Sequence, residues 1–445
     1  MYYNEYLSLK RDLSNGSKTL KDYEKSLHSL INKIIIDVQQ KNIDGDIKKV
    51  IDIVNSVKNI EVPTAAKRRF DNILLNESEI AERKTVLKSK PRVLYCVVTS
   101  LCNIKCIMCH IIKQKWELPE RAISEIIELM PYLEIVKWQG GEVFLYKHFE
   151  QLMDAAGKNN VSQEIVTNGL LLNERVINKL LNYNVDLYIS VDGLTKDVYE
   201  AIRVGANFDL LMNNLKLLKE IKSGFTNHVM NLGLNVLVMK KNIDQIEFYP
   251  EFANKYGFKK LCVNAFGPDF ISDENIFHYN KNKEFEIKIM QIKEKLLNKC
   301  RDLNIELFDC LPTFQKEASV ITDFKKDEIE NDEHKNKINN ADINDTNSKA
   351  KEDNIMLCHI PWQKIFIDSD GTINPECFCD RNNPVGNIGK DKISDIWNGG
   401  IMQEYRNIIA NESYHARCAK NCVTGITHIK ALKNIINPNL FWWYK

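Results

Sequence analysis

Three closely spaced cysteines are the strongest chemical signal in the sequence. Cys102, Cys106 and Cys109 follow a short apolar run, with three residues between the first two and two residues between the last two. Three thiolates within one short loop can wrap a single inorganic centre, and no fourth cysteine lies nearby. On a cubane 4Fe-4S cluster each iron takes one outer ligand. Three cysteine ligands would therefore leave one iron open, where a small molecule can chelate.

Structural zinc and disulfide bonds are the alternative uses of these cysteines. Closed zinc sites usually have four ligands supplied by two Cys-x2-Cys pairs, and this loop lacks that pattern. The 12 cysteines in 445 residues are too sparse for a disulfide-rich secreted scaffold. No signal peptide and no apolar run long enough to span a membrane is visible. We therefore expect a cytoplasmic protein without membrane association, whose cysteines are reduced or bound to metal.

Short apolar runs that alternate with helical patterns begin at Arg92 and predict repeated βα units around a parallel sheet. Six such units indicate an α/β fold with a partial (β/α)6, TIM-like barrel. Ligands of parallel α/β sheets bind at the carboxyl ends of the strands, and the cysteine loop leaves the first strand at such an end. The predicted strands are residues 93–98, 134–139, 163–167, 186–191, 232–239 and 260–265.

Two further motifs at strand ends give the chain a family resemblance. Gly140-Gly141-Glu142 follows the second strand, and Ser190-Val191-Asp192-Gly193 follows the fourth. Together with the cysteine spacing, these motifs resemble the radical S-adenosylmethionine (SAM) superfamily. The resemblance implies that the cysteine loop binds a 4Fe-4S cluster, and that SAM chelates its open iron. It extends over about residues 90–425.

The resemblance also implies which residues bind SAM. The turn of Gly140, Gly141 and Glu142 is expected to hold the SAM amino group, because glycines let backbone carbonyls approach closely. An ordinary strand-to-helix turn is the alternative. Asn168 after the third strand and Ser190 with Asp192 after the fourth offer hydrogen-bonding groups suited to the ribose and the amino-acid end.

Arg203 and Met108 complete the expected SAM site. Arg203 resembles the family's arginine that contacts the SAM carboxylate, a role that suits its planar fork of donors. The alternative is a surface arginine on a solvated helix. Met108 precedes the third cysteine and is expected near the adenine.

A second group of cysteines lies near the C-terminus, and this part resembles the SPASM, or shorter twitch, extension with its auxiliary iron-sulfur cluster. A hairpin around Asp370-Gly371 is predicted to bring two of these cysteines together. Cys379 is an alternative ligand to Cys377, and a four-thiolate zinc site is an alternative to the cluster. The expected ligands of one auxiliary 4Fe-4S cluster are Cys358, Cys377, Cys418 and Cys422.

Composition and periodicity divide the rest of the chain. Amphipathic stripes, such as Leu20, Tyr23, Leu27, Leu30 and Ile34, predict a helical module over residues 1–89, either for packing or for docking a substrate or partner. The predicted barrel occupies residues 90–310, and a charged flexible linker occupies 311–356. A small α+β auxiliary-cluster domain over 357–425 and a tail over 426–445 follow.

The predicted function follows from the resemblance. A radical SAM enzyme cleaves SAM reductively to a 5'-deoxyadenosyl radical, which abstracts hydrogen from a substrate. The leading substrate is a side chain of a ribosomally made peptide or a protein, which would be oxidised, crosslinked or epimerised. A carbohydrate or other small metabolite is one alternative, and a non-catalytic iron-sulfur or zinc protein is another. A low-potential donor such as flavodoxin or ferredoxin is the expected electron source.

Nucleic-acid binding is not expected. The chain has 61 basic and 60 acidic residues and a formal net charge of +1. A domain that binds nucleic acid through its overall charge is usually strongly basic.

Overall fold

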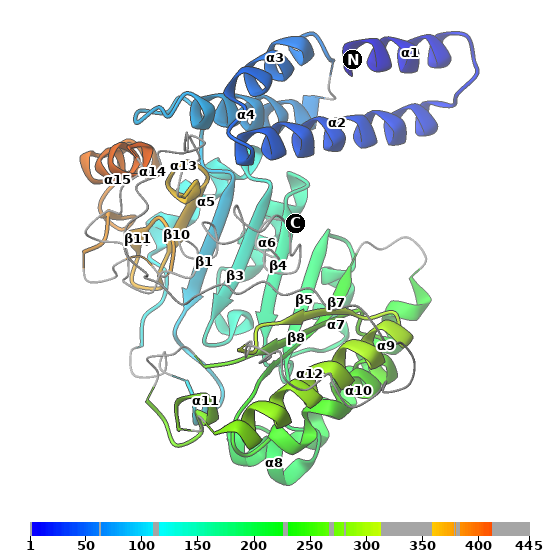
Figure 1. Ribbon diagram of the computed structural model, residues 1–445, viewed down its shortest axis with the longest axis vertical. Coiled ribbons are helices and arrows are strands. Elements are labelled where there is room, and N and C mark those ends of the chain that lie inside the picture. The colour runs from blue at the N-terminus through cyan, green and yellow to red at the C-terminus, as the bar shows by residue number, and fades with distance from the viewer. Residues whose placement is uncertain are drawn as a thin grey trace, which may run out of the picture.

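A computed structural model of the chain shows one large twisted sheet, helices around it and a helical module at one end (Figure 1). None of the helices in the described part of the chain combines the length and low polarity needed to cross a membrane. The structure describes residues 2–61, 64–109, 115–225, 230–266, 271–279, 282–312, 358–377, 379 and 383–411.

The sheet has ten strands in the order β12-β11-β10-β1-β3-β4-β5-β7-β8-β9. Pairing is parallel from β10 to β9 and antiparallel among β10, β11 and β12. The six predicted barrel strands are present as β1 (Val93–Thr99), β3 (Ile135–Gly140), β4 (Ser162–Thr167), β5 (Val185–Ser190), β7 (Asn231–Leu237) and β8 (Lys260–Asn264). The others in this sheet are β9 (Glu306–Asp309), β10 (Lys364–Ile367), β11 (Thr372–Asn374) and β12 (Gly386–Asn387).

Alternation along the strands gives the sheet two faces. On the outer face, Leu94 and Cys96 of β1 belong to the main hydrophobic core. On the opposite, inner face, Tyr95 and Val97 pack with Phe366 of β10. Cys96 is therefore a buried residue of the core.

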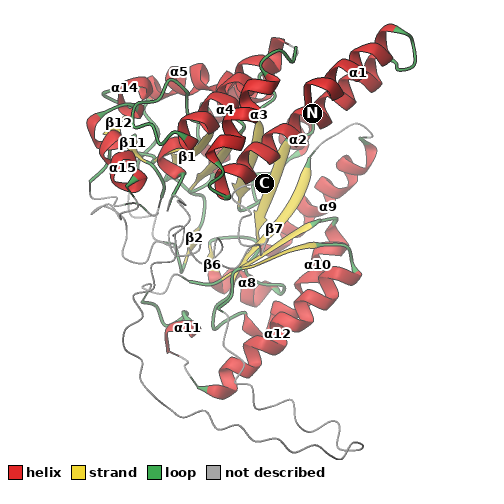
Figure 2. Cartoon of the chain, turned by 45° about the horizontal axis from the view of Figure 1, so that its top comes forward, coloured by secondary structure: helices red, strands yellow, loops and turns green. Residues whose placement is uncertain are grey.

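Helices follow the strands and cover the outer face (Figure 2). An apolar stripe after the cysteine loop forms α5, where Ala122, Ile123 and Ile126 are buried. Within the described residues, the short 3-10 segments η2 (Met130–Tyr132), η3 (Val143–Leu145) and η4 (Ile243–Phe248) complete turns between elements. The helices here are α5 (Glu120–Leu129), α6 (Phe149–Lys158), α7 (Glu174–Leu180), α8 (Lys196–Ile202), α9 (Phe208–Gly224), α10 (Tyr249–Tyr256), α11 (Ile276–Tyr279) and α12 (Lys283–Asp302).

The N-terminal segment is helical, as its stripes predicted. It contains α1 (Tyr2–Ser14), α2 (Leu20–Ile43), α3 (Ile47–Val57) and α4 (Thr64–Ala81). Leu27, Leu30 and Ile34 of the predicted stripe are buried in a core of their own. Leu20 is 61% exposed, because it is the first residue of α2 and lies beyond that core. The four helices pack at the amino ends of the strands, opposite the cysteine loop (Figure 1).

The C-terminal unit is joined to the barrel by strand pairing that sequence analysis did not foresee. The predicted hairpin around Asp370-Gly371 forms as β10 and β11, but β10 also pairs in parallel with β1, with Val93 opposite Lys364. After β12 the chain forms α14 (Ile393–Trp397) and α15 (Gly400–Ala410), while α13 (Ile360–Gln363) precedes β10. Most of the predicted linker and the whole predicted tail lie outside the described residues.

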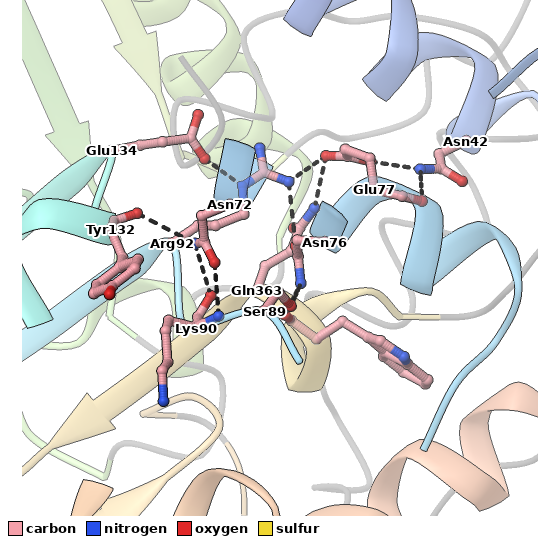
Figure 3. Close-up of polar contacts among 11 residues, drawn as sticks. Asn42, Asn72, Asn76, Glu77, Ser89, Lys90, Arg92, Tyr132, Glu134 and Gln363 are labelled. Carbon is pink, nitrogen blue, oxygen red and sulfur yellow. Dashed lines mark hydrogen bonds and ion pairs between the residues drawn. The ribbon is translucent and has the colours of Figure 1, made fainter. Parts of the chain in front are cut away.

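A buried polar network joins the helical module, the barrel and the C-terminal unit (Figure 3). Arg92, just before β1, forms ion pairs with Glu77 of α4 and with Glu134, whose Oε1 lies 2.5 Å from Nε. Asn76 of α4 donates to the backbone oxygen of Trp362 in α13 at 2.7 Å. The amide of Arg92 donates to the backbone oxygen of Gln363 at 2.8 Å. The start of β1 and α4 are thus fixed at one point to α13, whose Trp362 is 286 positions from Asn76 in sequence.

Candidate active site

The cysteine loop leaves the carboxyl end of β1 and is shaped by backbone pairing. The short strand β2 (Lys105–Cys106) pairs antiparallel with β6 (Arg203–Val204), so that Cys106 lies opposite Arg203. The amide of Cys109 donates to the carbonyl of Cys106 at 3.1 Å, which closes a turn. Cys102, Cys106 and Cys109 are all partly exposed. The three thiols therefore stay accessible on a loop whose backbone is fixed.

The predicted glycine turn lies directly against the start of this loop. The amide of Gly141 donates to the carbonyl of Thr99 at 2.7 Å, and the amide of Glu142 donates to that of Leu101 at 2.8 Å. A Cβ on Gly140 would overlap the carbonyl oxygen of Thr99, and a Cβ on Gly141 would overlap that of Leu101. Both positions require glycine because two backbones pass within contact of each other.

The Glu142 carboxylate is buried and connects two strand ends. Oε1 accepts from the Thr167 hydroxyl at 2.7 Å, and Oε2 accepts from the amide of Asn168 at 2.8 Å. Burial raises the pKa of Glu142, although these hydrogen bonds oppose that effect. In this structure Glu142 fixes the end of β4 to the turn after β3, which leaves the backbone of the turn as the surface offered to a ligand.

Asn168 extends the connection to the first cysteine. Its Nδ2 donates to Asn103 Oδ1 at 2.8 Å and lies 3.8 Å from the sulfur of Cys102. Its Oδ1 accepts from the amide of Leu170 at 2.9 Å, which sets the amide orientation. An N–H donor at this sulfur is suited to a thiolate that carries negative charge.

Arg203 and Asp192 lie beside the second cysteine. Arg203 is buried, with Nη1 3.8 Å from the Cys106 sulfur and Nη2 2.7 Å from Asp192 Oδ2. The surface-arginine alternative for Arg203 is therefore wrong. Burial raises the pKa of Cys106 to about 11, although the Arg203 charge opposes this effect. A metal that displaces the proton would convert such a thiol to thiolate.

The position after Asp192 requires a glycine, Gly193, because another chain segment passes close to it. A Cβ at Gly193 would overlap the backbone of Tyr199 in α8. Glycine lets α8 pack directly against the chain that leaves β5, and this packing places Arg203, the residue after α8, next to Asp192.

The remaining predicted SAM-site residues lie at the same edge of the barrel. Ser190 is the last residue of β5 and pairs with Asn235 of β7, with its side chain half-buried. Met108 is half-buried in the turn between the second and third cysteines. Their contact with SAM stays a prediction.

The predicted auxiliary ligands are only partly within the described residues. Cys377 is partly buried and packs against Tyr95, Val97 and Phe366 on the inner face of the sheet. Cys358 is partly buried before α13 and packs against the main core. Cys379 is also partly buried, so both candidates for one ligand position remain. Cys418 and Cys422 lie outside the described residues.

Sequence analysis missed the residues that anchor Asp192. Its Oδ1 accepts from the amide of Leu237 at 2.8 Å, and its carbonyl accepts from Asn242 Nδ2 at 2.9 Å. Tyr199 is fully buried, and burial raises the pKa of its hydroxyl. The Arg203 charge opposes this rise in pKa, and the Asp192 charge adds to it. Tyr199 and Arg203 are four residues apart, a spacing that places both on one side of α8 and could have indicated that Tyr199 belongs to the site. No sequence pattern pointed to Asn242.

The donor set fits an iron-sulfur cluster. Three half-exposed thiols come from one loop, and two of their sulfurs already have N–H donors, from Asn168 and Arg203. Hydrogen bonds to cluster sulfurs are a general means by which proteins tune such centres.

Comparison with known proteins agrees with this geometry. A model of the radical SAM superfamily matches residues 96–244, which include the cysteine loop, the glycine turn and Arg203. Residues 96–244 therefore form a domain of the radical SAM superfamily. A model of the SPASM iron-sulfur cluster-binding domain matches residues 358–423, which begin at Cys358 and include Cys422. The chain therefore also contains a C-terminal SPASM domain, in agreement with the resemblance seen in the sequence.

Related proteins match over different parts of the chain. Mycofactocin maturase MftC of Mycolicibacterium smegmatis is 30% identical over 166 residues, which cover 36% of this chain and 41% of that protein. The antilisterial bacteriocin subtilosin biosynthesis protein AlbA of Bacillus subtilis is 20% identical over 318 residues, or 69% of this chain and 59% of that protein. This chain thus spans well under half of the length of the mycofactocin maturase that it matches.

A solved structure shows the same fold over most of the chain. SuiB of Streptococcus suis aligns with a TM-score of 0.54 and 16% identity, covering 84% of this chain and 80% of SuiB. Another structure shows SuiB bound to the precursor peptide SuiA, with a TM-score of 0.53 and 16% identity, covering 80% of this chain and 78% of SuiB. At this identity the likeness shows the fold alone.

Proposed function

We propose that this protein is a radical SAM enzyme that modifies a side chain of a ribosomally made peptide or a protein by oxidation, crosslinking or epimerisation. The observation that carries the reaction class is the set of three accessible thiols at the carboxyl edge of the barrel, with N–H donors from Asn168 and Arg203. The peptide substrate is supported by the relatives, which include a bacteriocin biosynthesis protein and a structure with a precursor peptide.

The residues around the loop would act by binding and orienting. When bound, the cluster and SAM supply a 5'-deoxyadenosyl radical that takes a hydrogen atom from the substrate. Cys102, Cys106 and Cys109 would hold the cluster. Gly140 and Gly141 would present their backbone to the SAM amino group, while the buried Glu142 keeps that turn in place.

Met108, Asn168, Ser190, Asp192 and Arg203 are the remaining residues that we propose for the SAM site. Met108 lies in the cysteine loop, and Ser190 is the last residue of β5. The other three lie in segments that follow β4 or β5. The parallel strands bring these segments to one edge of the barrel.

The SPASM domain is proposed to hold one auxiliary 4Fe-4S cluster. Cys377 supports this position because it packs on the inner face of the sheet, against Tyr95 and Val97 of the strand that leads to the cysteine loop. The proposed ligands are Cys358, Cys377, Cys418 and Cys422, with Cys379 as the alternative to Cys377. A low-potential donor such as flavodoxin or ferredoxin would supply electrons in the cytoplasm.

Formation of 5'-deoxyadenosine tests the proposed reaction class. Anaerobically reconstituted protein with dithionite and SAM is expected to form this product, as measured by chromatography with mass spectrometry. Replacing Cys102, Cys106 and Cys109 together by Ala should abolish the product and remove one cluster's worth of iron.

A single replacement of Cys310, an exposed cysteine outside both ligand sets, is the matched control and should leave product and iron unchanged. Product formation that persists in the triple variant would overturn the proposed function.

A further inference from the structure

Two buried polar atoms in residues around Cys106 have no hydrogen-bond partner among the described residues: Tyr199 OH and Arg203 Nε. Asp192 Oδ2, which is also buried, makes an ion pair with Arg203 Nη2 at 2.7 Å. Buried polar groups are normally satisfied, so unsatisfied ones call for a functional explanation.

Asp192 is held rigidly by the sheet. Its Oδ1 accepts from the amide of Leu237 at the end of β7, and its carbonyl accepts from Asn242. The hydroxyl of Tyr249 donates to the carbonyl of Val191 at 3.0 Å, one residue earlier. Only Oδ2 therefore remains to act on Arg203.

Arg203 is held from the opposite direction, by the cysteine loop. Its backbone pairs with that of Cys106 through β2 and β6, and the amide of Ile107 donates to the carbonyl of Ile202 at 3.0 Å. The guanidinium consequently lies between two fixed groups, with Nη2 at Asp192 and Nη1 at the Cys106 sulfur. The planar guanidinium makes these two contacts from two different nitrogens held in a fixed geometry, whereas an ammonium group has a single nitrogen.

We propose that Arg203, positioned by Asp192, is an N–H donor to the sulfur of Cys106 and raises the reduction potential of the cluster before SAM is bound. This inference rests on the proposed function, because it requires a cluster on the cysteine loop. A positive charge and an N–H donor at a cluster sulfur both favour the reduced, more negative state. Asp192 is a positioning residue in this arrangement, since it acts through Arg203.

The potential of the SAM-free cluster separates this role from a role in binding SAM. An arginine that served only the SAM carboxylate would weaken SAM binding when replaced and leave the SAM-free potential unchanged. An arginine that acts on Cys106 would shift that potential. The probe is the reconstituted full chain without SAM, titrated with dithionite and followed by electron paramagnetic resonance.

Arg203→Gln is expected to lower the ratio of reduced to oxidised cluster at a fixed potential roughly tenfold, which equals about 59 mV for one electron. If this variant does not fold, Arg203→Lys, which keeps the charge but loses the fork, is expected to shift the ratio in the same direction by a smaller factor. An unchanged potential in a folded variant with a full cluster would overturn the proposal.

A double-mutant cycle tests the part of Asp192. Asp192→Asn keeps an oxygen for the amide of Leu237 but removes the charge that holds Arg203. If Asp192 acts through Arg203, its replacement shifts the potential by different amounts with and without Arg203→Gln, because neighbours that act together are not additive. Equal shifts in both backgrounds would show that Asp192 acts only as a distant charge and would overturn its positioning role.

Two matched controls and the wild-type protein complete the design. Asp186→Asn removes a carboxylate at the other end of β5, which pairs with Lys260, and should leave the potential unchanged. Arg175→Gln removes an exposed arginine of α7 and should do the same. Absence of a cluster signal from the wild-type protein would count against the proposed function itself, whereas a normal signal with unchanged variants would overturn only this inference.

Discussion

Gly141 shows how single atoms decide the shape of the site. Its missing Cβ leaves space for the carbonyl of Leu101, the residue before the first cysteine. We expect Gly141→Ala to displace the cysteine loop and to reduce iron content after reconstitution and SAM affinity together, each at least several-fold. Iron analysis and a SAM-binding titration measure the two effects.

Gly224 provides the matched control for Gly141. It lies in α9, and a Cβ there would meet nothing within 4 Å. Gly224→Ala should therefore leave iron content and SAM affinity unchanged. Normal iron and SAM binding in Gly141→Ala would contradict the close approach of the two backbones.

Glu142 is expected to act through its hydrogen bonds, since its carboxylate is fully buried. Glu142→Ala leaves the Thr167 hydroxyl and the Asn168 amide without their acceptor, which costs about 1–3 kcal/mol for each unsatisfied buried group. Glu142→Gln keeps an oxygen for the Asn168 amide and should cost less. Urea unfolding of both variants, together with SAM titration, checks the order.

SAM binding separates the two roles of Glu142. If the charge contacts the SAM amino group directly, Glu142→Gln will lose affinity as strongly as Glu142→Ala. We expect instead that Glu142→Gln binds SAM within a few-fold of wild type.

At the scale of elements, the network around Arg92 fixes α4 to the first strand and to α13 (Figure 3). Arg92→Met would leave Glu77, which is 1% exposed, without its cation. Removal of one partner of a buried ion pair costs about 3–5 kcal/mol. We expect a loss of this size in the free energy of unfolding, measured in urea.

An exposed ion pair of α4, the helix that carries Glu77, provides the comparison for Arg92. Lys67 and Asp71 of α4 both have side chains that are 53% exposed. Lys67→Met should cost less than about 1 kcal/mol, because solvent screens exposed pairs. Similar losses for the two variants would contradict a special role of the buried network.

For the whole molecule, the pairing of β10 with β1 makes the SPASM domain part of the barrel sheet. A chain that ends at residue 357 would expose the backbone edge of β1, and an uncovered edge strand promotes aggregation. We expect this truncated protein to aggregate in size-exclusion chromatography. A chain that ends at residue 425 keeps β10 and should elute as the full chain does; a monomeric, folded 1–357 fragment would contradict the expectation.

The position of the helical module also belongs to this scale. Its four helices pack at the amino ends of the strands, whereas the cysteine loop leaves the carboxyl end of β1 (Figure 1). Contacts such as Asn72 Nδ2 with the carbonyl of Lys90 at 3.1 Å fix it there. Packing and docking of a substrate or partner were the two roles expected for this module from the sequence. Its placement favours packing.

Features that depend on near neighbours in the chain could be predicted from the amino-acid sequence. The spacing of the cysteines, the six barrel strands and the position of Gly140-Gly141-Glu142 at a strand end could all be predicted, because each is a local pattern. Helix α2 followed in the same way from its apolar stripe. The SAM-site residues could be gathered at one edge because parallel strands bring their carboxyl ends together.

Contacts between groups far apart in sequence could not be predicted and became visible in the folded chain. Arg203 approaches Cys106 across 97 positions of sequence, and Asn76 reaches Trp362 across 286. The pairing of β10 with β1 likewise joins residues from opposite ends of the chain. No local pattern encodes these contacts, because they depend on how the whole sheet and its flanking helices pack.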